Sequence, residues 1–270
     1  MHKNVLCNVQ KMSFWGYVVP SSGRRGDSKR PVYDRLQYSI KPTTCSRLQS
    51  MSKFFPPVDF ADENGLLAVG GSFEPVWLLD AYSNGVFPWP VATDAPICWF
   101  APNPRAIIDF DDLHVSKRLE RTIRSRQFKI TSNVDFRGVI RGCATAQNRS
   151  GEVWITPQII RAYSHLHQLG IAHSVEAWQD GKLVGGVYGV AVNGLFAAES
   201  MFYYEPNASK VALVELVRHL KRQGFALFDV QIINDNTSRF GATEIPRQEY
   251  MARLRKALRL TPSFGLIMIE

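Results

Sequence analysis

The sequence predicts an α+β protein in which a mixed β-sheet is flanked by helices and preceded by a smaller domain. Asp180-Gly181 and Asn193-Gly194 each separate two apolar runs, and such dipeptides are strong signals for hairpin turns. A helical pattern over residues 207–224 then leads into a further apolar run, 225–233. Three antiparallel strands followed by a helical crossover to another strand give a mixed sheet.

Residues 1–50 show no helical or strand periodicity and hold nine of the 32 Lys and Arg residues but only two of the 24 acidic residues. We expect a disordered basic extension there, either sequence upstream of a true start at Met51 or an organelle presequence. The rest of the chain is almost neutral, so the net charge of +8 does not by itself predict a polyanionic partner.

A small N-terminal domain is expected over residues 51–102. It contains a helix that begins near Pro75, carries Trp77, Leu78, Leu79 and Tyr82 on its apolar side and ends at Asn84-Gly85. Residues 100–107 contain two prolines and are interpreted as a linker. The larger domain is therefore expected to span residues 103–270.

The larger domain begins with a basic helix that leads into a strand within residues 114–130. The next helix, 155–170, has Thr156 as its cap, Pro157 at its first position and Gly170 at its end. The remaining expected elements are strands 172–178, 182–190 and 195–202, a helix over 207–224 capped by Asn207, strand 225–233 and a helix near 246–258. This order is that of an acetyltransferase-like (GNAT-type) core.

The strand over residues 225–233 has two chemically different faces. Phe228, Val230 and Ile232 alternate with Asp229 and Gln231, and successive side chains of a strand point to opposite faces. A half-buried strand with a wet back face would give this pattern, and so would a strand that lines a polar site inside an apolar fold. Alternation alone does not decide between them.

Glu199 ends a strand among small and apolar residues. An exposed edge carboxylate is the commoner situation for such a residue. If apolar neighbours enclose it instead, we expect a cationic partner.

Two further features are compatible with nucleic-acid binding. Lys117, Arg118, Arg121 and Arg124 recur on one helical face, where like charges repel and a polyphosphate would relieve the repulsion. A solvated helix face explains the same pattern equally well. Trp89 and Trp154 lie in or beside loops, where Trp can stack on an unpaired base, although Trp more often belongs to a core.

Several function classes lack their sequence signals. The four cysteines are unpaired by spacing and the histidines show no metal-ligand spacing, so neither a zinc site nor a disulfide scaffold is expected. No apolar run reaches the roughly 18 residues of a membrane span. The turn "FYYEPNASK" has no glycine where coenzyme A would need bare backbone N–H groups, which disfavours a coenzyme A enzyme.

Taken together, the chain from about residue 55 to 258 resembles the leucyl/phenylalanyl-tRNA–protein transferase family. The stretches that carry this resemblance are "NGLLAVGG", "GVFPWP", "WFAPNPRAII", "LHVSKRL", "WITPQIIRAYSHLHQLGIAHSVEAW", "LVGGVYGV", "LFAAESMF", "NASKVAL" and "DVQIINDNTSRFGATEIPR". The resemblance implies transfer of Leu, Phe or in some members Met from aminoacyl-tRNA to the N-terminal Arg or Lys of a protein. The product is a degradation signal delivered to a Clp protease, and the reaction uses neither metal nor cofactor. We expect a monomer that acts in the cytoplasm without a membrane partner.

The resemblance also implies roles for individual residues. Trp89 and Trp154 would hold the terminal adenosine of the tRNA, and the basic helix from Lys117 would contact the acceptor stem. Glu199, Asp229 and Gln231 match reaction-centre positions. The implied aminoacyl pocket consists of Val187, Phe196, Met201, Leu213, Leu216, Leu220 and Phe228, with Asn234 as a polar member.

Because an aminoacyl ester is already activated, the enzyme mainly has to position the attacking amine. A neutral carboxamide is a poor base, so we interpret Gln231 as a hydrogen-bonding group for the amine. Asp229 would then orient Gln231, a ribose hydroxyl could carry the proton, and Glu199 would meet the cationic end of the acceptor. An N-acetyltransferase of the same fold and a non-catalytic RNA-binding module are the competing hypotheses.

Overall fold

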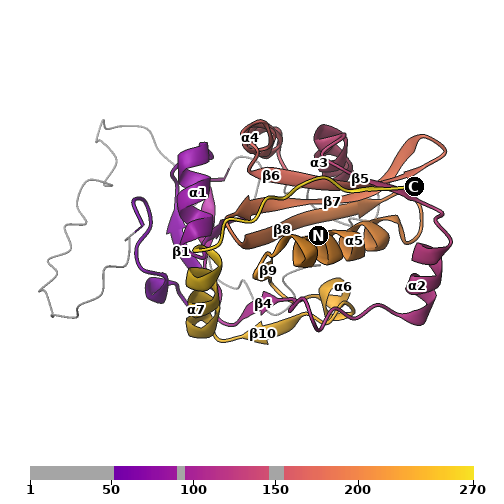
Figure 1. Ribbon diagram of the computed structural model, residues 1–270. Coiled ribbons are helices and arrows are strands. Elements are labelled where there is room, and N and C mark those ends of the chain that lie inside the picture. Colours follow the sequence, from indigo (N-terminus) through magenta and orange to yellow (C-terminus); the bar gives the residue numbers. More distant parts are fainter. Residues whose placement is uncertain (1–51, 90–94, 146–154) are drawn as a thin grey trace, which may run out of the picture.

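Figure 1 shows the computed structural model, which describes residues 52–89, 95–145 and 155–270. The predicted extension, 1–50, lies outside the described residues. The helices are α1 (Pro75–Ser83), α2 (Lys117–Arg124), α3 (Phe136–Thr145), α4 (Pro157–Gln168), α5 (Ala208–Gln223), α6 (Asp235–Ser238) and α7 (Arg247–Ala257), with a 3₁₀ turn at Val58–Phe60. The strands are β1 (Leu66–Val69), β2 (Phe87–Pro88), β3 (Cys98–Phe100), β4 (Arg105–Ile107), β5 (Lys129–Ser132), β6 (Ala172–Gln179), β7 (Lys182–Val192), β8 (Leu195–Tyr203), β9 (Leu227–Gln231), β10 (Thr243–Ile245) and β11 (Met268–Ile269).

Within these ranges the strands form two sheets. A three-stranded sheet has the order β1-β3-β2, and an eight-stranded sheet has the order β10-β4-β9-β8-β7-β6-β5-β11. Neighbours in the larger sheet are antiparallel except β8 and β9, which are parallel. The larger sheet is therefore mixed, and the predicted α+β class is confirmed.

Local signals place the elements that were expected. The side chain of Thr156 accepts a hydrogen bond from the backbone N of Ile159 at 3.3 Å, which caps α4. Asp180 and Gly181 both have positive φ, 49° and 72°, as a type I′ hairpin turn requires. This turn joins β6 to β7, and the turn at Asn193-Gly194 joins β7 to β8, which gives the meander β6-β7-β8.

Helices cover both faces of the larger sheet. α3 and α4 lie on one face and α5 on the other (Figure 1). One apolar cluster contains buried residues of α1, α3, α4 and α7 and also of the three-stranded sheet, and a second contains those of α5. The three-stranded sheet therefore shares its core with one face of the larger sheet.

Two irregularities in the larger sheet place the site described below. The parallel β8-β9 ladder has three pairs and ends at Ala197 opposite Asp229, although β8 continues to Tyr203. The β7-β8 register shifts between Gly189 opposite Ala198 and Tyr188 opposite Ser200, so Glu199 is the extra residue of a β-bulge. Bulges re-aim side chains and are frequent beside functional sites.

The structure corrects two expectations. Asn207 precedes α5, but its φ of 72° is left-handed instead of extended and its side chain makes no capping hydrogen bond. A side-chain cap needs the extended backbone that Asn207 lacks. The predicted linker 100–107 includes strand β4, which pairs with β9 and β10. The chain passes from the smaller to the larger sheet between Phe100 and Arg105, and the domain boundary at residues 102 and 103 stays a prediction.

Candidate active site

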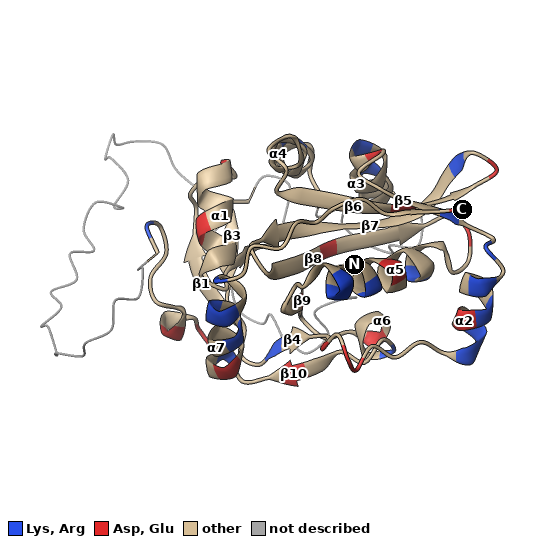
Figure 2. Cartoon of the chain, viewed as in Figure 1, with Lys and Arg blue, Asp and Glu red and all other residues tan. Residues whose placement is uncertain are grey.

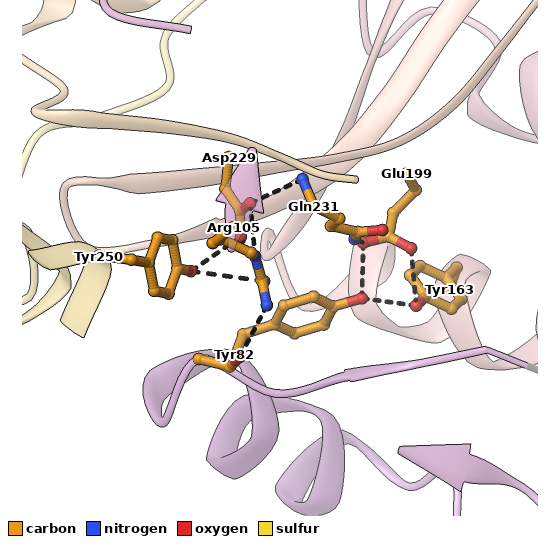
Figure 3. Close-up of polar contacts among 8 residues, drawn as sticks. Tyr82, Arg105, Tyr163, Glu199, Asp229, Gln231 and Tyr250 are labelled. Carbon is orange, nitrogen blue, oxygen red and sulfur yellow. Dashed lines mark hydrogen bonds and ion pairs between the residues drawn. The ribbon is translucent and has the colours of Figure 1, made fainter. Parts of the chain in front are cut away.

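Two polar side chains meet where the β8-β9 ladder ends. Gln231 closes β9, and its side-chain Nε2 donates a hydrogen bond of 2.9 Å to Oε1 of Glu199, the bulge residue of β8 (Figure 3). The bond joins the two strands just beyond their last backbone pair. The site thus lies inside the sheet, at the point where β8 and β9 stop pairing.

Glu199 accepts hydrogen bonds from three neutral donors. Oη of Tyr82, from α1, lies 2.7 Å from Oε1, and Oη of Tyr163, from α4, lies 3.2 Å from Oε2. The two tyrosine hydroxyls are 2.6 Å apart. The expected cationic partner is therefore wrong for the described residues: hydroxyls and a carboxamide satisfy this carboxylate.

Loss of contact with water sets the ionisation of this cluster, in which Tyr82 and Tyr163 are buried and Glu199 is half-buried. It raises the pKa of Glu199 to about 7, although the bonds from Tyr82, Tyr163 and Gln231 favour the charged form, and the nearby Asp229 carboxylate raises it further. Burial also raises the pKa of both tyrosines well above their usual value, so both hydroxyls keep their protons. Glu199 consequently changes charge near neutral pH.

Asp229 forms a buried ion pair with Arg105 of β4. Nε and Nη2 of Arg105 lie 2.9 and 2.6 Å from the two carboxylate oxygens, and the side chains are 2% and 1% exposed. Oη of Tyr250 donates to Asp229 Oδ2 at 2.8 Å, and Nη1 of Arg105 donates to the Gly85 carbonyl at 2.9 Å. The guanidinium stands 4.6 Å from the ring centroids of Phe87 and Tyr250. Burial alone would lower the pKa of Arg105, but the Asp229 charge raises it, so the guanidinium keeps its positive charge.

Asp229 reaches Gln231 through the backbone. The backbone N of Gln231 donates to Asp229 Oδ1 at 2.8 Å, whereas the carboxamide of Gln231 turns to Glu199. Gln231 has a φ of 66°, a left-handed conformation that non-glycine residues rarely adopt. The expectation that Asp229 orients Gln231 is therefore revised, because the contact fixes the main chain and leaves the carboxamide to Glu199.

The polar face of β9 is not wet. All five residues of the strand are buried, with Asp229 0% and Gln231 5% exposed. The half-buried interpretation of this strand is wrong. A polar site inside an apolar fold is what the structure contains.

The predicted pocket residues lie together on the α5 side of the sheet. They belong to one buried apolar cluster whose members include Val187, Phe196, Leu213, Leu216, Leu220 and Phe228, with Met201 packed against it. The rings of Phe196 and Phe228 stack at 5.9 Å. Tyr82 and Tyr163, by contrast, belong to the other apolar cluster and reach Glu199 from helices on the opposite face of the sheet.

Other predicted residues lie apart from the polar cluster. Asn234 caps α6, because its Oδ1 accepts from the backbone N of Asn236 and Thr237 at 2.9 and 3.0 Å. Trp89 is half-buried and packs against the cluster that contains α1. Trp154 lies outside the described residues. The basic residues of α2 are all exposed, namely Lys117, Arg118, Arg121 and Arg124. Figure 2 shows that Lys and Arg predominate along this helix.

Four site residues were not expected from the sequence. Tyr82 and Tyr163 sit on apolar helix stripes that predict core, Tyr250 lies in the last predicted helix, and Arg105 falls in the predicted linker. The described ranges contain no cluster of three or more His, Cys, Asp or Glu side chains suited to a metal ion. In the same ranges no helix has the length and apolar character to cross a membrane.

Known proteins match this chain over both of its sheets. The family model described as leucyl/phenylalanyl-tRNA protein transferase matches residues 107–255, and the model for the N-terminal domain of the same proteins matches 71–103. A curated leucyl/phenylalanyl-tRNA–protein transferase of Anaeromyxobacter sp. (strain Fw109-5) is 48% identical over 206 residues, which cover 76% of this chain and 87% of the relative. One from Aromatoleum aromaticum is 47% identical and covers 74% and 85%, and one from Solidesulfovibrio magneticus is 48% identical and covers 75% and 82%.

Proposed function

This chain belongs to the leucyl/phenylalanyl-tRNA–protein transferase family, and we propose that the Glu199–Gln231 cluster is where it carries out the family's reaction. The enzyme transfers Leu or Phe from aminoacyl-tRNA to the N-terminal Arg or Lys of a protein, which marks that protein for N-end rule degradation. One observation carries the site assignment: a carboxylate with a pKa of about 7 and a carboxamide meet at the end of a strand ladder, beside a buried apolar cluster.

The reaction requires an α-amine to attack an ester carbonyl. A C–N bond forms, the C–O bond to the ribose breaks, the amine loses one proton and the ribose oxygen gains one. A peptide α-amine has a pKa of about 7.7–8.0, so part of it is neutral near pH 7.5. Proton transfer is efficient when the acceptor has a pKa near the working pH.

Glu199 is the proposed proton acceptor, a role that replaces the expected ribose hydroxyl and the expected contact of Glu199 with the cationic end of the acceptor. Its carboxylate form predominates above pH 7, where it can bind the amine and take its proton. The hydroxyls of Tyr82 and Tyr163 hold the carboxylate in place and steady its charge. Gln231 is the neighbouring hydrogen-bonding group that orients the amine, in keeping with the weak basicity of a carboxamide.

Asp229 is a positioning residue in this proposal. Arg105 compensates its charge, and Oδ1 of Asp229 also accepts from the backbone N of Gln231, which has the left-handed conformation. The carboxamide of Gln231 is thereby directed at Glu199. Loss of Asp229 would act on the reaction through Gln231.

The donor side of the proposal uses the apolar cluster and the aromatic and basic residues. The cluster around Phe196 and Phe228 would take the Leu or Phe side chain, and in some cases Met. Asn234 is the polar residue that the family resemblance adds to this pocket. One methylene more or less in such a pocket changes discrimination by only about 1–3 kcal/mol, so related side chains are accepted together. Trp89 and Trp154 would hold the terminal adenosine, and α2 would contact the acceptor stem.

The proposal also includes the domain type, the domain bounds, the compartment and the oligomeric state. The meander, the crossover helix α5 and the short β8-β9 ladder support an acetyltransferase-like (GNAT-type) domain over residues 103–270, after an N-terminal domain over 51–102. We place the enzyme in the cytoplasm as a monomer, upstream of a Clp protease.

A transfer assay tests the proposal. Radiolabelled Leu or Phe on tRNA is incubated with an Arg-starting peptide and the wild-type protein, Glu199→Gln or Gln231→Ala. We expect transfer by the wild type and a loss of roughly 10²-fold or more in the Glu199→Gln variant, the size of a general-base contribution. Arg255→Gln, at an exposed position of α7, serves as the control. Full activity of both site variants would overturn the assignment.

A further inference from the structure

A groove of about 240 Å³ lies between α3 and α4, apart from the residues assigned above. Its lining consists of Arg137, Arg141, Ile160, Arg161, Ser164, His165 and Gln168. No lining side chain is acidic. The groove therefore concentrates positive charge at a helix–helix junction.

The basic side chains of the groove lie where they repel one another. Arg137 and Arg141 are four residues apart on α3, so their side chains share one face, and like charges at this spacing are unfavourable. All three arginines are exposed, and in the part of the chain that the structure describes none of them forms an ion pair. An anionic ligand would relieve this repulsion.

Ser164 gives a second, independent indication of a ligand. It is 6% exposed, lines the groove, and its Oγ has no hydrogen-bond partner among the described residues. A serine hydroxyl inside a helix usually bonds a carbonyl of the preceding turn, and buried polar atoms nearly always have a partner. A buried donor beside three guanidinium groups fits a ligand with several acceptor oxygens.

We infer that this groove binds a backbone phosphate of the donor tRNA, an inference that rests on the proposed function. The same helix links the groove to the reaction centre: Tyr163 contacts Glu199 from the inner face of α4, and Ser164 follows it toward α3. An α-helix with its side chains is about 10–12 Å across. A phosphate in the groove is thus separated from Glu199 by roughly the thickness of one helix, a distance suited to a nucleotide near the aminoacylated end.

Phosphate contacts leave a signature in the salt dependence of binding. Each neutralised phosphate contributes about 0.7–0.9 to the slope of log K against log salt concentration. The variant Arg137→Gln/Arg141→Gln/Arg161→Gln should lower this slope by about one phosphate contact and weaken tRNA binding by roughly tenfold. Arg255→Gln, an exposed arginine of α7 without an ion pair among the described residues, is the matched control and should bind as the wild type does.

Ser164→Ala separates a ligand-binding role from a structural one. Removal of a buried hydroxyl that has no protein partner should leave the melting temperature unchanged or raised, yet it should weaken tRNA binding by several-fold. Fluorescence anisotropy with labelled tRNA, in a salt series, measures the affinity and the salt slope. Unchanged affinity and salt slope in the triple variant and in Ser164→Ala would overturn the inference.

Two further arms identify the source of the phosphate. If inorganic phosphate stabilises the wild type but not the triple variant, while tRNA affinity is the same in both, the groove is a small-anion site and the tRNA assignment is wrong. Transfer of Leu to an Arg-starting peptide at saturating tRNA should persist in the triple variant. Loss of tRNA affinity with retained transfer would support tRNA binding by the groove. Unchanged affinity together with wild-type transfer in the variants would refute tRNA binding by the groove and leave the proposed reaction intact.

Discussion

Replacing Arg105 tests whether the buried ion pair holds the site together. Arg105→Met keeps the apolar stem but leaves the Asp229 carboxylate, 1% exposed, without its cation. Removing one partner of a buried pair costs about 3–5 kcal/mol, because the remaining charge stays out of water. The lost bond to the Gly85 carbonyl adds to this cost. We therefore expect the free energy of unfolding to fall by at least about 3 kcal/mol, a value within that range.

A surface ion pair with the same shortest N–O distance is the control. Arg253 lies 2.6 Å from Asp109, the same N–O distance as in the Arg105–Asp229 pair, but its side chain is 34% exposed and that of Asp109 44%. Arg253→Met should cost no more than about 1 kcal/mol. The contrast sets a buried pair with two N–H···O contacts against an exposed pair with one, at the same shortest N–O distance.

Urea unfolding measures both variants and a double-mutant cycle. In Arg105→Met/Asp229→Asn neither ionised partner remains, so the loss should be smaller than the sum of the single losses, with a coupling energy of roughly 2 kcal/mol or more. The carboxamide introduced by Asp229→Asn would retain a carbonyl for the hydroxyl of Tyr250. An Arg105→Met cost below about 1 kcal/mol, or a coupling energy near zero, would refute the argument that this buried ion pair stabilises the fold around the site.

Three other perturbations follow from the same contacts. Tyr82→Phe removes a donor that favours the charged form of Glu199, so the midpoint of the pH dependence of transfer should move upward from about 7, whereas an unmoved or lower midpoint would contradict the assigned hydrogen bond. Gly142→Ala would place a Cβ 2.6 Å from the ring of Phe202, so the free energy of unfolding measured in urea should fall by about 1–3 kcal/mol. A rise in this free energy, as expected for Ala in an uncrowded helix, would contradict the close packing of α3 on β8. Arg118→Gln/Arg121→Gln on α2 should lower the salt slope of tRNA binding by about 1–2, and an unchanged slope would remove α2 from the tRNA interface.

Elements with strong local signals could be predicted from the sequence. Pro75 and Asn84-Gly85 bound α1, Thr156 and Pro157 begin α4, and the two turns define the β6-β7-β8 meander. These signals act within a few residues, so they do not depend on the rest of the fold. Element order was enough to predict a mixed sheet.

Elements defined by tertiary contacts could not be predicted in this way. α3 contains Gly138 and Gly142, which lower helix propensity, yet a Cβ at Gly142 would meet Phe202 of β8. Strand β4 has three residues next to two prolines and owes its place to pairing with β9 and β10. Neither element has a local pattern that distinguishes it from a loop.

The site was only partly visible in the sequence for a related reason. Alternation in β9 indicates that Asp229 and Gln231 share a face, and Glu199 stands out as a carboxylate among apolar residues. Their partners Tyr82 and Arg105 are 117 and 124 positions distant from Glu199 and Asp229, respectively. A tyrosine on an apolar stripe predicts core, and nothing around it reveals a half-buried carboxylate opposite its hydroxyl. The ionisation of Glu199 therefore emerges only when three separate elements come together.

The pH dependence of peptide transfer tests the role of Glu199 most directly. We would measure kcat/KM for an Arg-starting peptide from about pH 5.5 to 8.5, a range that brackets both groups, with wild type and Glu199→Gln at saturating charged tRNA. If the carboxylate, with its pKa of about 7, and the neutral amine, with a pKa of about 7.7–8.0, are both required, log kcat/KM of the wild type approaches a slope of about 2 against pH below about 6.5. Glu199→Gln should be much slower and retain a slope of about 1 from the amine. The same shallow slope in both proteins, at similar rates, would contradict the account.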